Sequence, residues 1–254
     1  MSIGTCKLCN QVKKLVKAHI IPRSFELRAK GVSKSLLEAR QYDVKTVKIW
    51  QNGVWDDKIL CAACEDRFKL WDDYGFKILG NPPGNNVLPR NEAELESFIL
   101  KDIDYALLKL FILSVLWRAS VSSQPFFSKI RLGKHEAAIA DMIRNQNPGS
   151  YDQFAVIIGR LVGQQFPNAL LSPRRQRTPE GINFSVMFIN SIKIMVKVDR
   201  QALPQILEPV VLKPQQKNIA MPMPLFDGEI VSLREGAEIF RGWLSKTPSA
   251  SSTK

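Results

Sequence analysis

The sequence predicts an α+β protein, and three observations support this fold class. Two β-rich runs, at 46–60 and at 183–198, predict strands. Between residues 92 and 121 apolar side chains recur at helical spacing, which predicts one long helix. All four cysteines lie in two pairs near the N-terminus, and they predict a small metal-bound module there.

Three shorter helices are expected at 24–30, at about 134–145 and at about 233–244. Ser24 is suited to cap the first of them, and Gly31 to end it. Asn91 is suited to cap the long helix. The segment 154–162 is compatible with either a strand or a helix.

Turn-forming residues divide the chain into three predicted regions. The segment 81–86 has the turn-rich sequence NPPGNN, and the character of the sequence changes again at Tyr151. We therefore expect a zinc module over 1–80, a helical region over 81–150 whose two helices form a helical hairpin, and an α+β region over 151–254, which folds around a 183–198 hairpin. The Ser/Thr-rich tail, 246–254, is predicted to be disordered.

The composition favours a globular protein. Of its 254 residues 45% are hydrophobic, enough for one large core or several small ones. No N-terminal stretch has the pattern of a secretion signal, so we expect a cytoplasmic protein. The most apolar stretch, 106–119, is shorter than the ~20 residues that a membrane span requires. It is therefore interpreted as part of a buried helix, and no membrane partner is expected.

The net charge of +12 is concentrated at the two ends of the chain. Region 1–80 has 15 basic against 9 acidic residues, and region 151–254 has 13 against 8, whereas the middle is nearly balanced with 8 against 7. Such an excess favours a polyanionic partner, usually a nucleic acid. Basic charge scattered over the surface of a soluble protein is the alternative.

Three arginines form the densest basic cluster. Arg174, Arg175 and Arg177 lie between Pro173 and Pro179, which predicts a basic loop suited to contact phosphates. A solvated loop without a partner is the alternative.

The cysteines form two pairs, Cys6 with Cys9 and Cys61 with Cys64, each separated by two residues. This spacing lets one short turn direct two sulfurs to one ion, and two such turns complete a tetrahedral S4 site that favours zinc. Two disulfides are the alternative, but the lack of a secretion signal favours reduced thiols. Four thiolates leave no open coordination position, so the zinc would be structural.

The order of elements around these cysteines is that of a treble-clef zinc finger. A first knuckle is followed by extended residues from Val12 to Pro22 and then by a predicted hairpin with Asn52-Gly53 at its turn. The second strand of that hairpin leads to the second knuckle, which begins a helix.

Two knuckles that enclose the sequence AHIIP, with His19 as its histidine, resemble the HNH branch of the His-Me finger nucleases. The resemblance covers about the first quarter of the chain. It implies an endonuclease that hydrolyses phosphodiester bonds in DNA, in bacterial defence or mobile-element biology. It also implies that His19 is the general base, and that Mg²⁺ or Mn²⁺ stabilises the leaving oxygen.

The sequence departs from this family at three positions. An acid or a histidine commonly precedes the base, where this chain has Ala18. Asp56 stands at the place of the middle asparagine, which would orient His19, and Glu65 stands where a metal-binding His or Asn is common. Two other functions remain open: a non-catalytic zinc finger that binds nucleic acid or a protein, and a zinc-stabilised scaffold for an acidic partner.

Overall fold

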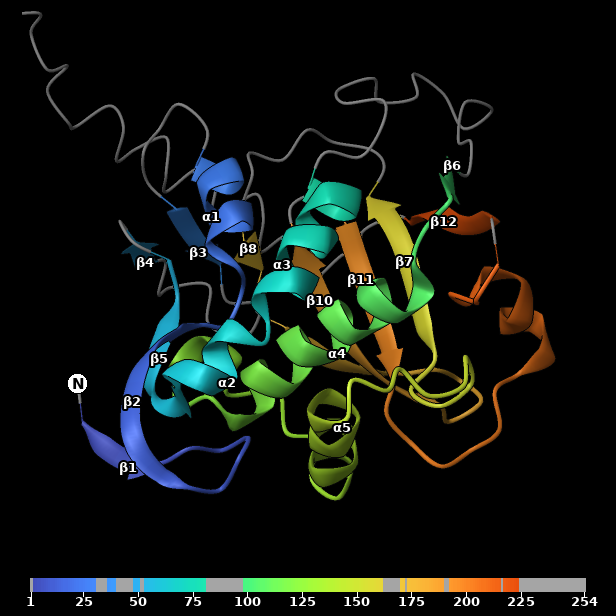
Figure 1. The fold of residues 1–254 in the computed structure, drawn as a ribbon. Coiled ribbons are helices and arrows are strands. Elements are labelled where there is room, and N and C mark those ends of the chain that lie inside the picture. Colours follow the sequence, from blue (N-terminus) through green and yellow to red (C-terminus); the bar gives the residue numbers. More distant parts are fainter. Residues whose placement is uncertain are drawn as a thin grey trace, which may run out of the picture.

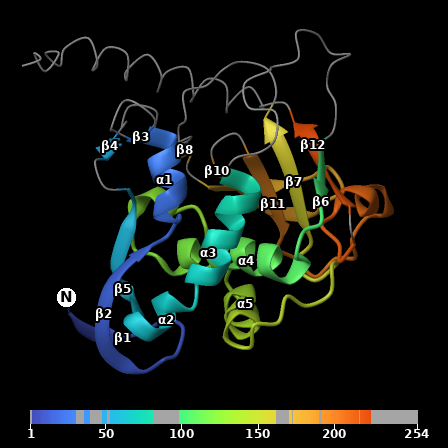
Figure 2. The same ribbon diagram turned by 45° about the horizontal axis from the view of Figure 1, so that its top comes forward.

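The computed structural model describes residues 2–30, 36–39, 48–50, 53–80, 98–161, 170–171, 173–189, 192–215 and 217–223. Over these residues the chain forms helices and mainly antiparallel sheets, so the predicted α+β class is confirmed. The N-terminal strands lie on one side, the largest sheet lies on the other, and two helices cross the middle (Figure 1). Figure 2 shows the same arrangement after a turn of 45°.

The N-terminal part is a sheet that runs into a helix. Strands β1 (Ile3–Thr5), β2 (Val12–His19) and β5 (Trp55–Cys61) form an antiparallel sheet with β2 in its centre. Helix α1 (Arg23–Lys30) follows β2, in agreement with the helix predicted at 24–30. Helix α2 (Ala62–Asp66) begins directly after β5, so the end of β5 and the start of α2 are held together by the covalent chain.

The predicted hairpin around residues 52–53 is wrong. Strand β4 (Lys48–Trp50) pairs with β3 (Leu36–Ala39), whereas β5 pairs with β2. Gly53 does have the positive φ of +73° that a tight turn requires, but Asn52 lies outside the described residues. The strand pairing is decided by contacts distant in sequence, since β5 must bring Cys61 beside the first knuckle.

The largest sheet has six strands in the order β6-β12-β7-β11-β10-β9. Neighbours in it are antiparallel except β12 and β7, which are parallel. Its strands are β6 (Phe98–Lys101), β7 (Val156–Leu161), β9 (Arg174–Arg177), β10 (Asn183–Ile189), β11 (Ile192–Lys197) and β12 (Lys217–Met223). A two-residue strand, β8 (Leu170–Leu171), pairs with β3 in a third small sheet.

Three expectations are settled by this sheet. The 183–198 hairpin is confirmed by β10 and β11, although its turn at 190–191 lies outside the described residues. The ambiguous segment 154–162 contains a strand, β7. The predicted basic loop at 174–177 is wrong, because these residues form β9, the strand next to β10 at one end of the sheet.

Helix α4 (Tyr105–Val121) is the long helix, and it begins later than predicted. Residues 98–101 form strand β6, and Asp104 caps the helix by accepting a hydrogen bond from the Leu107 amide at 3.0 Å. The predicted first turn at 92–97, with Asn91 as its cap, lies outside the described residues.

Helix α5 (His135–Arg144) agrees with the helix predicted at 134–145. The remaining helices are α3 (Lys69–Gly75), a π-helical turn η2 (Phe76–Gly80), and the 3-10 helices η4 (Pro125–Phe127) and η5 (Gln205–Val210).

The core is organised around α4. All of its residues from 108 to 120 are buried, as expected for a helix that is apolar on every side. One continuous cluster joins buried side chains of the N-terminal sheet, α3, α4, α5 and the six-stranded sheet. Phe111 illustrates the closeness of this packing, because its ring stacks on Phe25 at 5.6 Å and a Cβ added at Gly75 would approach it to 2.4 Å. The division into regions 1–80, 81–150 and 151–254 stays a prediction.

One buried lysine fastens α4 to the loop before β7. The Lys109 ammonium donates to the Ser150 carbonyl at 2.6 Å, to the Gln153 carbonyl at 2.7 Å and to the Tyr105 hydroxyl at 3.1 Å. Burial lowers the pKa of Lys109 to about 8, and the charge of Asp152 partly opposes this effect.

Among the described helices, none combines the length and the apolar character needed to cross a membrane. The predicted helix at 233–244 and the predicted disordered tail at 246–254 lie outside the described residues.

Candidate metal centre and the neighbouring His19 site

The first cysteine pair lies in the turn between β1 and β2. The Cys6 amide donates to the Gln11 carbonyl and the Asn10 amide to the Cys6 carbonyl, each at 2.9 Å, and Asn10 has a left-handed φ of 58°. The Lys7 amide donates to the Ile59 carbonyl of β5 at 2.8 Å. This last hydrogen bond holds the first knuckle against the strand that carries the second one.

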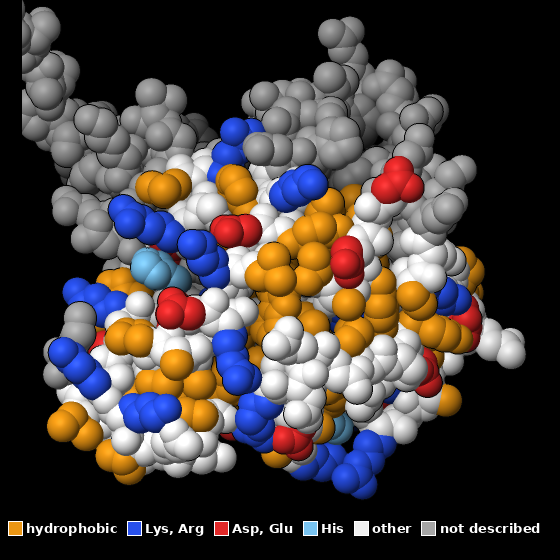
Figure 3. All heavy atoms as spheres, in the orientation of Figure 1, with side chains coloured by type: hydrophobic (Ala, Val, Ile, Leu, Met, Phe, Trp, Pro, Cys, Tyr) orange, Lys and Arg blue, Asp and Glu red, His pale blue; other side chains and the backbone are white. Residues whose placement is uncertain are grey.

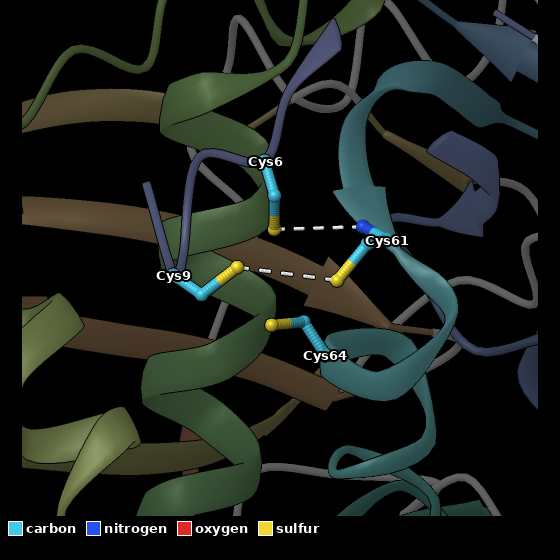
Figure 4. Close-up of side chains that lie close together, drawn as sticks. All are labelled: Cys6, Cys9, Cys61 and Cys64. Carbon is cyan, nitrogen blue, oxygen red and sulfur yellow. Dashed lines mark hydrogen bonds between the residues drawn. The ribbon is translucent and has the colours of Figure 1, made fainter. Parts of the chain in front are cut away.

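The second pair spans a strand end and a helix start. Cys61 is the last residue of β5, and Cys64 lies within α2. The Cys61 amide donates to the Cys6 sulfur at 3.4 Å, and the Cys9 and Cys61 sulfurs are 4.0 Å apart (Figure 4). All four thiols therefore point into one space between the turn and the helix.

The spacing of the sulfurs fits one metal ion. The four Sγ atoms lie within 4.8 Å of one another. A tetrahedral site with zinc–sulfur bonds of about 2.3 Å places its sulfurs about 3.8 Å apart, so a small contraction would suffice. The four cysteines are free, and a disulfide would require a sulfur separation of about 2.05 Å, half the distance between Cys9 and Cys61.

The surroundings of the thiols distinguish them from one another. Burial opposes ionisation of Cys6, but hydrogen bonds from the backbone of Cys9, Cys61 and Leu8 lower the pKa of its thiol to about 7. Burial and the neighbouring sulfurs raise the pKa of Cys64. A divalent cation among the sulfurs would stabilise all four as thiolates, which is the form that binds metals.

His19 is the last residue of β2 and is half-buried. It lies opposite Trp55, the first residue of β5. Burial, with the charges of Arg23 and Arg118, lowers the pKa of its ring. The imidazole is therefore neutral near pH 7 and able to accept a proton.

Glu65, on helix α2, contacts the end of β2. Its Oε1 accepts a hydrogen bond from the His19 amide at 3.3 Å, and its Oε2 is buried without a hydrogen-bond partner. Burial raises the pKa of Glu65 to about 7, an effect that Asp72 reinforces and Arg118 opposes. The described contact between these two residues is therefore made by the His19 backbone and the Glu65 carboxylate, and their roles in catalysis stay a prediction.

Arg118 of α4 is a site residue that the sequence reasoning did not assign. Its guanidinium group is fully buried and donates to the His19 carbonyl at 2.8 Å and to both carboxylate oxygens of Asp72 at 3.0 and 2.7 Å. It also lies 4.7 Å from the centre of the Phe68 ring. A signal for this residue was present, since an arginine in the most apolar stretch of a sequence must be buried beside an acid or a carbonyl.

Asp56 forms its described hydrogen bonds with residues other than His19. It is fully buried, and its Oδ2 accepts hydrogen bonds from the Ser122 hydroxyl and from the Ser123 amide and hydroxyl at 2.7–3.0 Å. Its Oδ1 accepts one from the Lys58 amide at 2.9 Å. Burial raises the pKa of Asp56, but these hydrogen bonds outweigh it and the net shift is downward. The described contacts of Asp56 join β5 to the end of α4, and none of them reaches the His19 ring.

The residues around His19 fit a catalytic metal ion in one respect. The unpartnered Oε2 of Glu65 is a hard oxygen of the kind that Mg²⁺ prefers. Within the described ranges, however, the four cysteines are the one group of three or more His, Cys, Asp or Glu side chains close enough to hold a metal ion. Asp72, another carboxylate that acts on Glu65, is bound to Arg118 through both oxygens.

The predicted basic cluster lies elsewhere, on β9. Arg175 and Arg177 are exposed, whereas Arg174 is partly buried.

Comparison of the chain with family models, curated proteins and solved structures finds no significant match.

Proposed function

We propose that the protein is a zinc-stabilised nuclease of the HNH type that hydrolyses phosphodiester bonds in DNA. The observation that carries the proposal is the hydrogen bond from the His19 backbone amide to the Glu65 carboxylate, whose other oxygen is buried and has no hydrogen-bond partner. Two antiparallel strands followed by a helix, with a histidine on the first strand and a ligand on the helix, is the arrangement that the HNH resemblance implies.

The four-cysteine centre supplies the framework in this proposal. Zinc bound to Cys6, Cys9, Cys61 and Cys64 joins the turn after β1 to the start of α2, and so completes a treble clef. Since α2 carries Glu65 directly after Cys64, the zinc fixes the position of the carboxylate relative to β2. The zinc itself has no open position and takes no part in the reaction.

The reaction assigns one role to each side chain. His19 is neutral near pH 7 and accepts the proton of the water that attacks phosphorus. Glu65 would hold Mg²⁺ or Mn²⁺ through its free oxygen, and such an ion stabilises the charge on the phosphate and the leaving oxygen. Arg118 holds the His19 carbonyl in place through the hydrogen bond from α4.

Cleavage of supercoiled plasmid by the zinc-loaded protein tests this proposal. We expect nicking with Mg²⁺ or Mn²⁺, and its loss in His19→Ala, while the zinc content and DNA binding of that variant stay near those of the wild type. Activity that persists in His19→Ala, or that is absent from the wild type with both ions, would refute the nuclease.

A specific observation favours a second function, a non-catalytic zinc finger that binds nucleic acid or protein. Arg118 already supplies a cation beside Glu65 and Asp72, which disfavours a second cation there. For this function the same experiment gives DNA binding without nicking, and His19→Ala leaves the binding unchanged.

A further inference from the structure

We infer that a basic surface formed by residues outside the N-terminal cysteine module binds the phosphate backbone of a nucleic acid. Its members come from the connection between α4 and α5, from β9 and from the turn after β11, and they are Arg131, Lys134, Arg175, Arg177 and Arg200. Like the proposed function, this inference assumes a nucleic-acid partner, but it does not require that the protein cleaves it.

Direct contacts join β9 to both neighbouring segments. The Arg175 guanidinium donates to the Arg131 carbonyl, which connects the strand to the residues before α5. The Arg177 Nε donates to the Gly181 carbonyl at 3.3 Å, and the Gln201 Nε2 donates to the same oxygen at 3.0 Å. Arg200 precedes Gln201, so its backbone lies beside the end of β9.

His135 places Lys134 and Arg200 together. Its ring packs edge-on against Phe154, with ring centres 5.8 Å apart. Burial lowers the pKa of His135, and the positive charges of Lys134 and Arg200 lower it further. Lys197 acts on the same ring in the same sense and Asp199 opposes them. Lys134 and Arg200 therefore both lie near the His135 ring.

The five cations are exposed, and within the part of the chain that the structure describes none of them forms an ion pair. The nearby Asp199 does not neutralise them, because Lys197 and the Asn183 amide hold its carboxylate. Lys and Arg side chains also gather at the lower edge of the molecule, around α5 (Figure 3). Such a concentration of unpaired charge attracts a polyanion.

The geometry of this surface favours a nucleic acid over a membrane. Arg175 and Arg177 lie two residues apart on a strand, so they share a face with a spacing of about 7 Å on a rigid support. Guanidinium groups bind phosphate oxygens in a fork. Surfaces that bind membranes combine cations with apolar side chains, but the large exposed apolar residues of the described chain lie on other elements: Ile3, Val12, Leu27, Leu70 and Ile206.

A matched pair of charge variants tests the inference. The surface variant changes the five cations to Gln. The control variant changes five exposed lysines of the first 80 residues, none of them inside a cysteine pair, to Gln, so that both variants lower the net charge by five: Lys13, Lys14, Lys58, Lys69 and Lys77. Binding of a labelled 20-base-pair duplex is measured by anisotropy from 50 to 200 mM NaCl, without Mg²⁺ so that no cleavage intervenes. We expect the surface variant to lose about tenfold or more in affinity at 100 mM salt, and the salt slope to fall by about 0.9 for each phosphate contact removed.

Equal weakening in both variants, or unchanged binding in the surface variant, would overturn the inference. So would a wild-type protein that binds phosphatidylserine vesicles but not the duplex. If the variant with five substitutions does not fold, Lys134→Gln/Arg200→Gln replaces it, since both side chains are exposed. Intact duplex binding without plasmid nicking would refute the nuclease and leave this inference standing.

Discussion

The Arg118 side chain connects the His19 carbonyl, 2.8 Å away, to the Asp72 carboxylate, 2.7 Å away. One buried guanidinium group therefore ties the central helix α4 to the end of β2 and to α3. The candidate site is consequently built from the zinc module and the middle of the chain together, and neither part alone contains it.

Loss of one partner of this ion pair should be costly. Arg118→Met leaves a largely buried Asp72 without its counter-charge, and we expect the free energy of unfolding to fall by about 3–5 kcal/mol. Urea unfolding of the zinc-loaded protein measures this value. Adding Asp72→Leu to Arg118→Met should restore part of the loss, because no buried charge then remains unpaired. Strictly additive effects of the two substitutions would show that the pair is not coupled.

Removal of a zinc ligand should unfold the N-terminal module. Binding of structural zinc supplies on the order of 10 kcal/mol to such modules, so Cys61→Ser should lose both the metal and the fold. Elemental analysis should find about one zinc per chain in the wild type and close to none in the variant. The same result is expected for Cys6→Ser, because each cysteine supplies one of four bonds. A wild-type protein purified without zinc, yet fully folded, would contradict the assignment.

Glu65→Gln tests the proposed metal ligand. The amide keeps the size of the side chain but removes its charge, so nicking with Mg²⁺ should be weak and excess Mn²⁺ should partly restore it. Rates measured over a range of metal concentrations separate a binding defect from a loss of chemistry. Asp73→Asn is a matched control, since Asp73 is exposed on α3. An equal loss of nicking activity in both variants would mean that the loss comes from the changed net charge and not from a missing metal ligand.

The buried Lys109 predicts a stability change at alkaline pH. Its pKa is about 8 in the folded chain and about 10.4 when unfolded, so between these values the unfolded state binds more protons. Stability should therefore rise with pH from 8 to 10, by about 1–2 kcal/mol relative to a variant without the amine. Lys109→Met is that variant, and the difference between the two unfolding curves over this range is the measurement. A difference in unfolding free energy that stays constant from pH 8 to 10 would show that burial does not lower the pKa of Lys109.

Asp56→Ala should destabilise the fold without a specific effect on chemistry. Three donor groups of Ser122 and Ser123 lose their common acceptor, which we expect to cost about 2–4 kcal/mol. If Asp56 instead orients His19 as the HNH resemblance implies, nicking by the folded fraction should fall much further. Activity normalised to the fraction folded distinguishes these outcomes.

Local spacing in the sequence predicts the cysteine cluster and one hairpin, but it does not predict which distant strands pair. The spacing within each cysteine pair and the alternation across 183–198 predicted the four-sulfur cluster and the β10–β11 hairpin. Asn52-Gly53 also looked like a hairpin turn, but β5 joins a strand about 40 residues earlier in the chain, because the first knuckle must reach Cys61. No local pattern encodes such a partner.

The basic segment and the buried arginine show a second reason for error. Arg174, Arg175 and Arg177 were read as a loop because charged residues between prolines suggest solvent, yet a strand at the end of a sheet tolerates charge on its open side. Arg118 lies in an apolar helix, and its partners come from β2 and α3, so the helix sequence alone does not reveal its contacts. Both depend on tertiary neighbours.

The place of β12 governs the order in which this protein can fold during synthesis. Strand β12 comes from residues 217–223 and lies between β6, at 98–101, and β7, at 156–161. The ribosome must therefore release most of the chain before β6 can join the sheet, whereas all four cysteines have been synthesised once residue 64 is added. Zinc can bind early, but β6 cannot pair until β12 has been synthesised. Such late strand pairing slows folding and leaves an unpaired strand that is prone to association with other chains.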